Sequence, residues 1–256
     1  MQVLQDMMGR EINLPKQPKR IISIVPSQTE LLYDLGVGDR VVGITKFCIK
    51  PKHWYRNKPR VGGTKNINFE KVQSLNPDLI IANKEENTKE DIEKLRENYP
   101  VWVSDINTYQ EALVSIQSIA ELCNKGEKGK ELVSEIEKRR RKYKAHYQNT
   151  RPKKVLYLIW RNPWMTVGKQ TYIHSILNEL GYKNVIGNGR YPMLTDDEIK
   201  ALSPDEVFLS SEPYPFKEKH INEIQRLLPK SKIKLVDGEL YSWYGSRLLH
   251  TFCLSK

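Results

Sequence analysis

The chain alternates between short β-branched runs and amphipathic helical stretches. Arg20 to Val25 is the first such run and stops at Pro26. Apolar residues then recur at helical spacing until Gly36, and Arg40 to Ile44 predicts a second strand. The same order continues along the chain, which predicts an α/β fold of parallel sheets covered by helices. Further strands are expected at 79–82, 101–103, 154–159, 184–186 and 232–236, and further helices at 90–99, 109–123, 172–180 and 221–228.

One phrase of the sequence occurs twice. Residues 68–81, NFEKVQSLNPDLII, return as residues 195–208, TDDEIKALSPDEVF, at an offset of 127. Each copy begins with an acid and an apolar run, which predict a short helix. The motif Leu-x-Pro-Asp then predicts a turn, because proline cannot continue the preceding helix, and the apolar segment after it predicts a buried strand. The offset places Glu70 opposite Asp197, and it predicts a duplicated architecture.

The stretch between the two copies is typical of one long helix. From Glu127 to about Gln148 it contains no proline and a single glycine, with apolar residues at helical spacing among charges. A surface helix with a solvated Arg139-Arg140-Arg141 face would explain its charge. A rigid connection between two lobes is the alternative, which the repeat favours. The predicted domains are an N-terminal α/β lobe at 1–125, a bridging helix at 126–149 and a C-terminal α/β lobe at 150–256, both lobes being Rossmann-like with parallel sheets.

The composition is that of a folded, globular protein. Hydrophobic residues make up 39% of the 256 and charged residues 29%, which excludes the disordered and membrane classes. Much of the formal net charge of +11 lies in three runs, Lys16 to Arg20, Lys50 to Arg60 and Lys138 to Lys144, without a zinc-finger or RNA-binding motif. We therefore expect no nucleic-acid partner, and favour a general attraction to anionic ligands or membrane surfaces.

Cysteine usage and the start of the chain bear on the compartment. Cys48, Cys123 and Cys253 are widely spaced and odd in number, which argues against a disulfide framework or a zinc site. No apolar run approaches the roughly 20 residues of a membrane helix, so the protein is peripheral to a membrane at most. Met1 to Pro15 show no apolar export segment. We expect a cytoplasmic protein if the sequence is complete, and a periplasmic or cell-surface protein if a leader was removed.

Motifs of catalysis and metal binding are weak. Gly168-Lys169-Gln170-Thr171 is similar to the end of a phosphate-binding loop, but Pro163 stands where the first glycine belongs. Gly62-Gly63 lacks the rest of a dinucleotide fingerprint and predicts a turn. The five histidines are scattered and are each expected to be structural or exposed. We predict no catalytic residue, no metal site and no catalytic cofactor, and hence not an enzyme.

Aromatic and basic residues gather in loops that follow predicted strands. The ligand of a doubly wound sheet lies at the carboxyl ends of its strands, and Trp160, Arg161, Trp164, Trp243 and Arg247 fall in such loops. Each of these aromatic residues, taken alone, could equally well lie in the core or contact a ligand. Their clustering in loops favours ligand contact for the group as a whole. These loops suit a large planar or polyanionic ligand held by stacking, cation–π contacts and charge-assisted hydrogen bonds.

Several of these segments together resemble a known family. They are Arg20 to Glu30, Val61 to Glu70, Leu75 to Ile80, the mid-chain helix and Leu202 to Asp205. The chain is similar, from about Pro18 to Leu249, to the helical-backbone (class III) solute-binding proteins of ABC importers, in particular the cobalamin- and iron-siderophore-binding branch. The resemblance implies two Rossmann-like lobes bridged by one long helix, with the ligand in the cleft between them.

The resemblance also implies a membrane partner. In that family an acid on each lobe docks to arginines of the permease dimer. Glu70 stands at the first position, and Asp197 stands at the second, where glutamate is usual, with Glu198 adjacent as an alternative. A monomer is expected.

The resemblance suggests a ligand class and its contacts. Phe47 stands where the cobalamin binders have a stacking tyrosine, whereas Thr64 and Asn83 replace tryptophans. The histidines and carboxylates of the metal-ion branch are not evident, so a corrinoid or another metal chelate, namely cobalamin, heme or a ferric siderophore, is favoured over a free ion. The predicted ligand-binding residues are Ser27, Phe47, Lys65, Asn83, Trp160, Arg161, Trp164, Tyr191, Trp243 and Arg247.

Three functions follow from these observations. The first is the substrate-binding subunit of an ABC importer, which binds its ligand without turnover. The second is a cytoplasmic carrier or sensor of a corrinoid or metal chelate, which the missing export segment would suit. The third is an enzyme built on the same scaffold.

Overall fold

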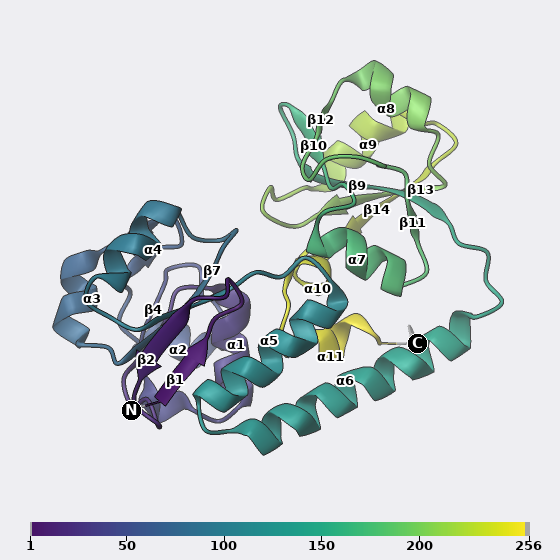
Figure 1. The fold of residues 1–256 in the computed structure, drawn as a ribbon. Helices are drawn as coiled ribbons and strands as arrows, with labels where there is room; N and C mark the ends of the chain where they lie inside the picture. Colours follow the sequence, from purple (N-terminus) through teal and green to yellow (C-terminus); the bar gives the residue numbers. More distant parts are fainter. Residues whose placement is uncertain (1, 254–256) are drawn as a thin grey trace. The chain divides into compact units, whose positions relative to one another are not determined.

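The computed structural model describes residues 2–253, which divide into two compact units (Figure 1). Unit 1 comprises Met1–Ile106, Gln110–Glu135 and Tyr244–Arg247, and unit 2 comprises Asn107–Tyr109, Ile136–Trp243 and Leu248–Lys256. The long helix α6 (Gly126–Tyr147) passes from one unit to the other between Glu135 and Ile136. The helix itself is confirmed, and the predicted domain limits stay a prediction.

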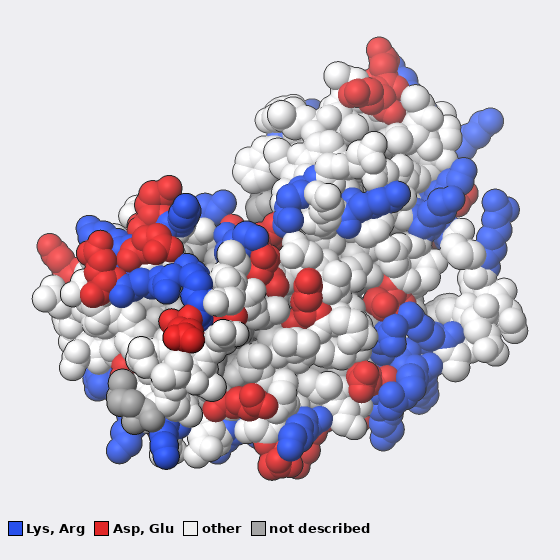
Figure 2. All heavy atoms as spheres, viewed as in Figure 1, with Lys and Arg blue, Asp and Glu red and all other residues white. Residues whose placement is uncertain are grey.

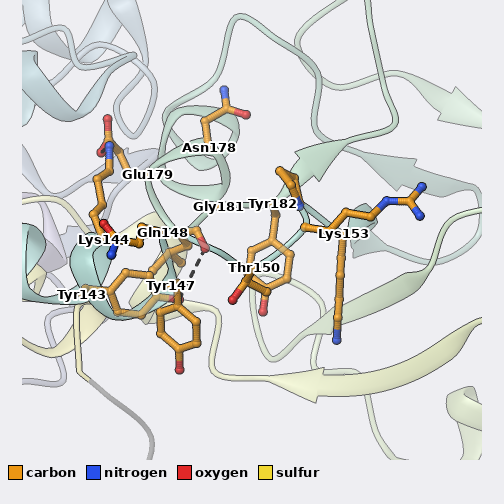
Figure 3. Close-up of a pocket in the computed structure, with 13 residues that line it drawn as sticks. Tyr143, Lys144, Tyr147, Gln148, Thr150, Lys153, Asn178, Glu179, Gly181 and Tyr182 are labelled. Carbon is orange, nitrogen blue, oxygen red and sulfur yellow. Dashed lines mark hydrogen bonds and ion pairs between the residues drawn. The ribbon is translucent and has the colours of Figure 1, made fainter.

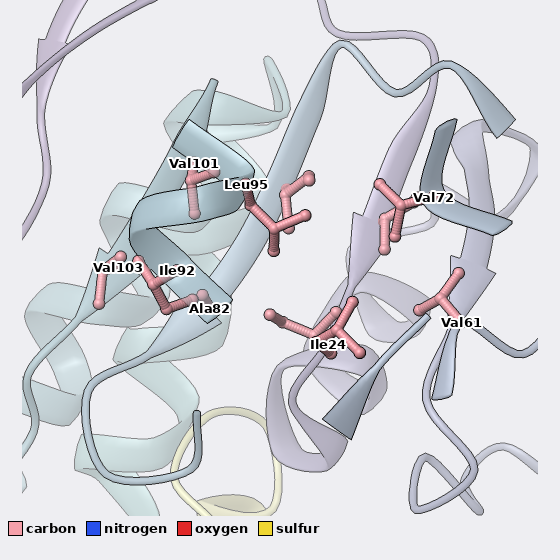
Figure 4. Close-up of a cluster of buried hydrophobic side chains, with 11 residues drawn as sticks. Ile24, Val61, Val72, Ala82, Ile92, Leu95, Val101 and Val103 are labelled. Atoms are coloured by element: carbon pink, nitrogen blue, oxygen red, sulfur yellow. The ribbon is translucent and has the colours of Figure 1, made fainter. Parts of the chain in front are cut away.

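The sheet of unit 1 is parallel throughout, in the order β4-β3-β7-β8. Ile21 lies opposite Leu79, and all five residues of β7 are buried, as the apolar pattern predicts for a central parallel strand. Helices α3 and α4 cover one face, where Val72 and Leu95 join the strand side chains in a single cluster (Figure 4). The elements are β3 (Ile21–Ser23), α1 (Pro26–Asp34), η1 (Gly38–Arg40), β4 (Val41–Ile44), α2 (Lys52–Asn57), α3 (Phe69–Leu75), β7 (Leu79–Asn83), α4 (Lys89–Arg96), β8 (Val101–Ser104) and α5 (Tyr109–Leu122), the last of which belongs to this unit from Gln110 onward.

Two small antiparallel pairs complete unit 1. The hairpin of β1 (Gln2–Gln5) and β2 (Glu11–Leu14) was not predicted, and its turn depends on buried Asp6, whose carboxylate accepts from the backbone of Met8 and Arg10. The pair β5 (Gly62–Gly63) and β6 (Asn66–Ile67) shows that the turn predicted at Gly62-Gly63 is wrong by two residues, because the two glycines form a strand and the turn lies at Thr64 and Lys65. Gly62 has φ +103, and a Cβ there would lie 2.3 Å from the Asn66 oxygen, so only glycine fits.

The sheet of unit 2 is mixed, with a parallel centre and an antiparallel extension. Strands β11, β9, β13 and β14 are parallel, whereas β10 runs antiparallel to β9, and β12 antiparallel to β10. The expectation of a loop after Trp160 is therefore wrong in part, because the chain turns back at Asn162-Pro163 and pairs again. The strands are β9 (Lys154–Trp160), β10 (Trp164–Thr166), β11 (Lys183–Asn184), β12 (Met193–Leu194), β13 (Glu206–Ser210) and β14 (Lys232–Val236).

Helices cover both faces of this second sheet. Ile199 of α8 and Ile224 of α9 pack with Leu156 and Leu158 of β9 on one face, and Leu177 of α7 packs on the other. The helices are α7 (Tyr172–Glu179), α8 (Asp196–Leu202), α9 (Glu218–Leu227), α10 (Glu239–Ser242) and α11 (Leu248–Thr251). The α/β fold with two Rossmann-like parts is confirmed.

The duplicated phrase forms the same local structure in both units. Asn76 ends α3 with φ 41°, and Ser203 ends α8 with φ 44°, so each helix stops in the left-handed conformation before its proline. The aspartate that follows ties the strand to its neighbour. Asp78 accepts hydrogen bonds from the backbone of Lys19 and Arg20, and Asp205 accepts one from Lys154. The Leu-x-Pro-Asp core is therefore structural.

Candidate functional site

The two acids singled out by the repeat occupy equivalent positions. Glu70 and Asp197 are each the second residue of their helix, α3 and α8, and both are exposed. Among the described residues, Glu70 takes part in no ion pair, while the Asp197 carboxylate lies 2.8 Å from the Lys200 Nζ. Lys200 lowers the pKa of Asp197. Both carboxylates are exposed and therefore accessible to a partner.

Glu198 has a different role from Asp197. Its carboxylate accepts hydrogen bonds from the Thr195 backbone N–H at 2.7 Å and from the Thr195 hydroxyl at 2.9 Å, while the Thr195 oxygen accepts from the Glu198 N–H. This capping box lowers the pKa of Glu198 and stabilises the start of α8. Of the two alternatives at this position, Asp197 has the freer carboxylate.

The carboxyl edge of the second sheet carries an aromatic group. Trp160, at the end of β9, is 40% exposed and meets Tyr214 edge-on at 5.6 Å. Trp164 stacks on Phe216 and donates from Nε1 to Asp196, so it anchors the first turn of α8. The ring of Trp160 is thus accessible to solvent, whereas Trp164 is fixed by contacts with Phe216 and Asp196.

The other predicted ligand residues of unit 2 differ in their accessibility. Arg161 lies over the Trp164 ring at 5.2 Å, and its Nε is 2.5 Å from the Glu223 carboxylate. Tyr191 is 39% exposed, with the Arg190 guanidinium 5.9 Å from its ring centre. Trp243 is buried. Trp160 and Tyr191 therefore present the accessible aromatic surface.

The carboxyl edge of the first sheet is polar and buried. The Gln28 amide donates to the Ser104 hydroxyl at 2.6 Å, and the Asn83 amide donates to the same hydroxyl at 3.0 Å. The Asn83 oxygen in turn accepts from the backbone of Glu85 and Glu86. Asn83 therefore joins the ends of β7 and β8. Gln28 and Ser104 are not among the predicted ligand-binding residues, although Ser104 directly follows the strand expected at 101–103 and Gln28 lies in the first turn of α1.

Ser27 lies beside this network in the first turn of α1. Its buried hydroxyl and the Gln28 side-chain oxygen have no hydrogen-bond partner among the described residues. Buried polar atoms of this kind usually bond to a ligand or to ordered water. Ser27 therefore stays a predicted ligand-binding residue.

Three further predicted residues of unit 1 are placed differently. Phe47, just after β4, is 51% exposed, and Lys65 is exposed in the turn between β5 and β6. Arg247 is buried and pairs with Glu30 of α1, its Nε lying 2.9 Å from the carboxylate. Burial raises the pKa of Glu30, and the Arg247 charge opposes this rise. Phe47 and Lys65 are accessible to solvent, whereas Arg247 is engaged in an ion pair with α1.

The part of the chain that the structure describes contains neither a metal-binding cluster nor a membrane-spanning helix. Within residues 2–253, no cluster of three or more histidine, cysteine, aspartate or glutamate side chains has the geometry to hold a metal ion. None of the helices described is both long and apolar enough to span a membrane.

Comparisons with known proteins place the chain in a family. It is 31% identical over 214 residues to the ABC transporter substrate-binding lipoprotein YvrC of Bacillus subtilis, a match that covers 80% of this chain and 67% of that protein. It is 25% identical over 199 residues to the vitamin B12-binding protein of Vibrio cholerae, covering 77% and 72%.

Solved structures agree on the fold. The periplasmic vitamin B12-binding protein BtuF of Vibrio cholerae superposes with a TM-score of 0.81 at 22% identity, over 93% of this chain and 95% of that one. A possible iron-binding periplasmic protein of Staphylococcus epidermidis gives 0.79 at 24% identity, over 93% and 96%. Residues 21–228 match the sequence model of the periplasmic binding proteins, and the chain belongs to this family of binding proteins.

Proposed function

We propose that this chain is the substrate-binding subunit of an ABC importer, which holds a corrinoid or another metal chelate outside the membrane and releases it unchanged. Family membership supports a binding role, because the family is one of binding proteins and not of enzymes. The relatives named for vitamin B12 support the ligand class, with cobalamin ahead of heme and ferric siderophores.

The observation that carries the proposal is the equivalence of Glu70 and Asp197. Two copies of one helix–strand unit present an exposed carboxylate at the same helical position. A permease built from two like subunits offers the same basic surface twice, and each copy can pair its acid with an arginine there. Glu198 is excluded from this role in our proposal, since its carboxylate is engaged by Thr195.

The ligand contacts that we assign are exposed aromatic side chains, namely Phe47 after β4 in unit 1, and Trp160 at the end of β9 and Tyr191 before β12 in unit 2. Aromatic faces suit the flat surface of a corrin or porphyrin ring. Ser27 adds a buried hydroxyl with hydrogen-bonding capacity to spare. Asn83, Trp164, Trp243, Arg161 and Arg247 act as positioning residues, because each is buried or engaged by a neighbour.

Titration calorimetry with cyanocobalamin, hemin and a ferric siderophore tests the proposal directly. We expect saturable binding of at least one of these, and mass spectrometry of the recovered ligand should show it unaltered. Trp160→Ala should weaken that binding about tenfold, since an aromatic contact contributes about 1 kcal/mol beyond its buried area. Tyr55→Ala removes a ring of similar exposure (38%) on α2 and should leave binding unchanged. No saturable binding of any of the three would contradict the ligand class.

A further inference from the structure

A hollow of about 510 Å³ lies in unit 2, between the end of α6, residues 148–153 and the end of α7. All the residues that line it belong to this unit. In Figure 3, Tyr143, Lys144 and Tyr147 stand on one side of the hollow, and Tyr182 and Lys153 on the other. Its volume suits a small molecule, since sites for such ligands occupy roughly 300–1,000 Å³.

The hollow is separate from the ligand contacts proposed above for this unit. Lys153 lines the hollow and directly precedes β9, whereas Trp160 is the last residue of β9. A strand rises about 3.3 Å per residue, so these two residues are roughly 23 Å apart along the chain direction. The hollow therefore lies at the amino end of β9, away from the ring of Trp160.

Three tyrosines supply the aromatic part of the wall, and each of them is half-buried. The rings of Tyr143 and Tyr147 lie 4.6 Å apart, and the Tyr143 hydroxyl donates to the Leu180 oxygen at 3.4 Å. Tyr182 meets Phe208 of β13 edge-on at 5.0 Å. These contacts fix the rings and leave part of each accessible, so a flat ligand can pack against them at little cost in side-chain entropy.

Two of these phenols are uncharged at neutral pH. Burial raises the pKa of Tyr143 to about 12, and it also raises the pKa of Tyr182. These tyrosines therefore do not repel an anionic ligand.

The one acid among the described residues of the wall is already paired. Glu179 meets both the Arg140 Nε and the Lys144 Nζ at 2.5 Å. Although burial alone would raise the pKa of Glu179, these two partners hold it below its ordinary value. Figure 2 shows Lys and Arg side chains gathered over the C-terminal part of α6, so the hollow lies in positive surroundings.

Arg151 differs from the other two cations of the wall. The Lys153 Nζ meets the Glu206 carboxylate at 2.6 Å, and Lys144 is engaged by Glu179. Arg151 is exposed and forms no ion pair with any residue between 2 and 253. Arginine suits a carboxylate in particular, because two parallel N–H groups of its side chain match the two carboxylate oxygens.

We propose that this hollow binds a small aromatic carboxylate, whose ring packs against the tyrosines and whose carboxylate pairs with Arg151. A neutral sugar fits less well, because it needs many neutral hydrogen-bonding groups. Two of those in the wall are engaged, the Tyr143 hydroxyl by Leu180 and the Asn178 amide by His174. An aliphatic acid would leave the rings unused, and an uncharged aromatic molecule would leave Arg151 without a partner.

An NMR titration with naphthoate tests the ring and the charge separately. The comparison probes are naphthalenemethanol, which has the ring without the charge, and cyclohexanecarboxylate, which has the charge without an aromatic ring. We expect naphthoate to bind most tightly of the three. It should shift the backbone amide signals of Thr150 and Gly181, which line the hollow, and not that of Gly245 in unit 1. Absent saturable binding of naphthoate, equal binding of the three probes or tighter binding of maltose would overturn the proposal.

One pair of variants isolates the charged contact. Arg151→Gln should weaken naphthoate binding about tenfold, because it removes a charge-assisted hydrogen bond, and should leave naphthalenemethanol binding unchanged. Lys142→Gln is the control of equal charge loss, at an exposed position of α6 that does not line the hollow. An equal loss in both variants would show an effect of net charge alone and overturn the assignment of Arg151.

A second pair isolates the aromatic contact. Tyr147→Ala should weaken the binding of naphthoate and naphthalenemethanol about fivefold. The control Tyr33→Ala removes a ring of 43% exposure from α1 in unit 1 and should change neither. Loss of naphthoate binding in Trp160→Ala would place the probe at the other end of β9 and overturn the proposal. Unchanged circular dichroism and thermal midpoints establish that the variants are folded.

Discussion

The two copies of the helix–strand unit, α3–β7 and α8–β13, share a backbone and differ in how they begin. Asn68 caps α3 alone, by accepting a hydrogen bond from the Lys71 N–H. Thr195 caps α8 together with Glu198, in a reciprocal pair. The third helical residue is thus a lysine in one copy and an acid with a capping role in the other.

This difference shows which positions the fold requires and which it leaves open. Both copies keep the left-handed helix end, and both keep the cap and the aspartate that binds the neighbouring strand, because these two side chains accept hydrogen bonds from backbone N–H groups. Glu70 and Asp197 satisfy no backbone group among the described residues, and both are nevertheless acids. Acids in the first turn favour the positive end of the helix dipole, and in our proposal these two also serve a partner outside the chain.

The largest expected effect follows from reversing both acids. In proteoliposomes that contain the cognate permease and ATPase, Glu70→Lys with Asp197→Lys should abolish uptake, because each pairing becomes a repulsion. Ligand affinity, measured by calorimetry, should not change. Glu198→Gln serves as the control and should retain most of the uptake. Normal uptake by the double variant would remove the docking assignment.

The next effect concerns the aspartates that anchor the strands. Asp78→Ala removes two charge-assisted hydrogen bonds, to the Lys19 and Arg20 N–H groups at 2.7 and 2.8 Å. Asp205→Ala removes a single bond, to the Lys154 N–H at 2.7 Å. We expect losses in the free energy of unfolding of about 2 and about 1 kcal/mol, respectively. Urea denaturation measures both, and an equal loss would mean that the two anchors act alike.

Removing the helix caps should also destabilise the two copies unequally, by a smaller difference, and here the second copy should lose more. Asn68→Ala should cost about 1 kcal/mol of unfolding free energy. Thr195→Ala should cost somewhat more, because Glu198 then also loses its hydroxyl partner. Gln73→Ala, at an exposed position of α3, provides the reference in the same urea experiment. A costlier loss at Asn68 would show that the capping box adds nothing.

The smallest effect concerns the pairing of Asp197 with Lys200. Lys200 lowers the pKa of Asp197, so this contribution to stability is present above the ordinary pKa of 3.8 and is lost as the pH falls through the lowered value. Lys200→Ala should return the pKa of Asp197 to near 3.8, as measured by NMR titration of the carboxyl carbon. An unchanged pKa of Asp197 in this variant would show that Lys200 is not the cause of the lowered value.

Local and periodic features could be predicted from the sequence. The central strands and the long helix α6 follow from runs of apolar residues at fixed spacing. The helix ends at Gly36 and Gly181, with φ of +72° and +80°, follow from the freedom of glycine in the left-handed region. The equivalence of Glu70 and Asp197 needed only an alignment of the chain with itself.

Features that depend on distant partners could not be predicted in this way. The hairpin β1–β2 is short, and its turn is held by Asp6 and by a bond from Met7 to Val103. Strands β10 and β12 have two or three residues each, too few for a periodic signal. Arg247 was assigned to the ligand as a loop arginine, and its pairing with Glu30 joins residues 217 positions apart.

The sequence by itself determined the α/β class, the duplication and the position of one acid in each copy, because these depend on spacing along the chain. Only the tertiary structure decided which side chains remain available. It showed that Glu198 is engaged in its own helix cap while Asp197 is exposed and meets Lys200, and that Trp160 is exposed while Trp243 is buried. Availability depends on which groups from elsewhere in the chain satisfy or cover a side chain, and such contacts leave no mark on local spacing.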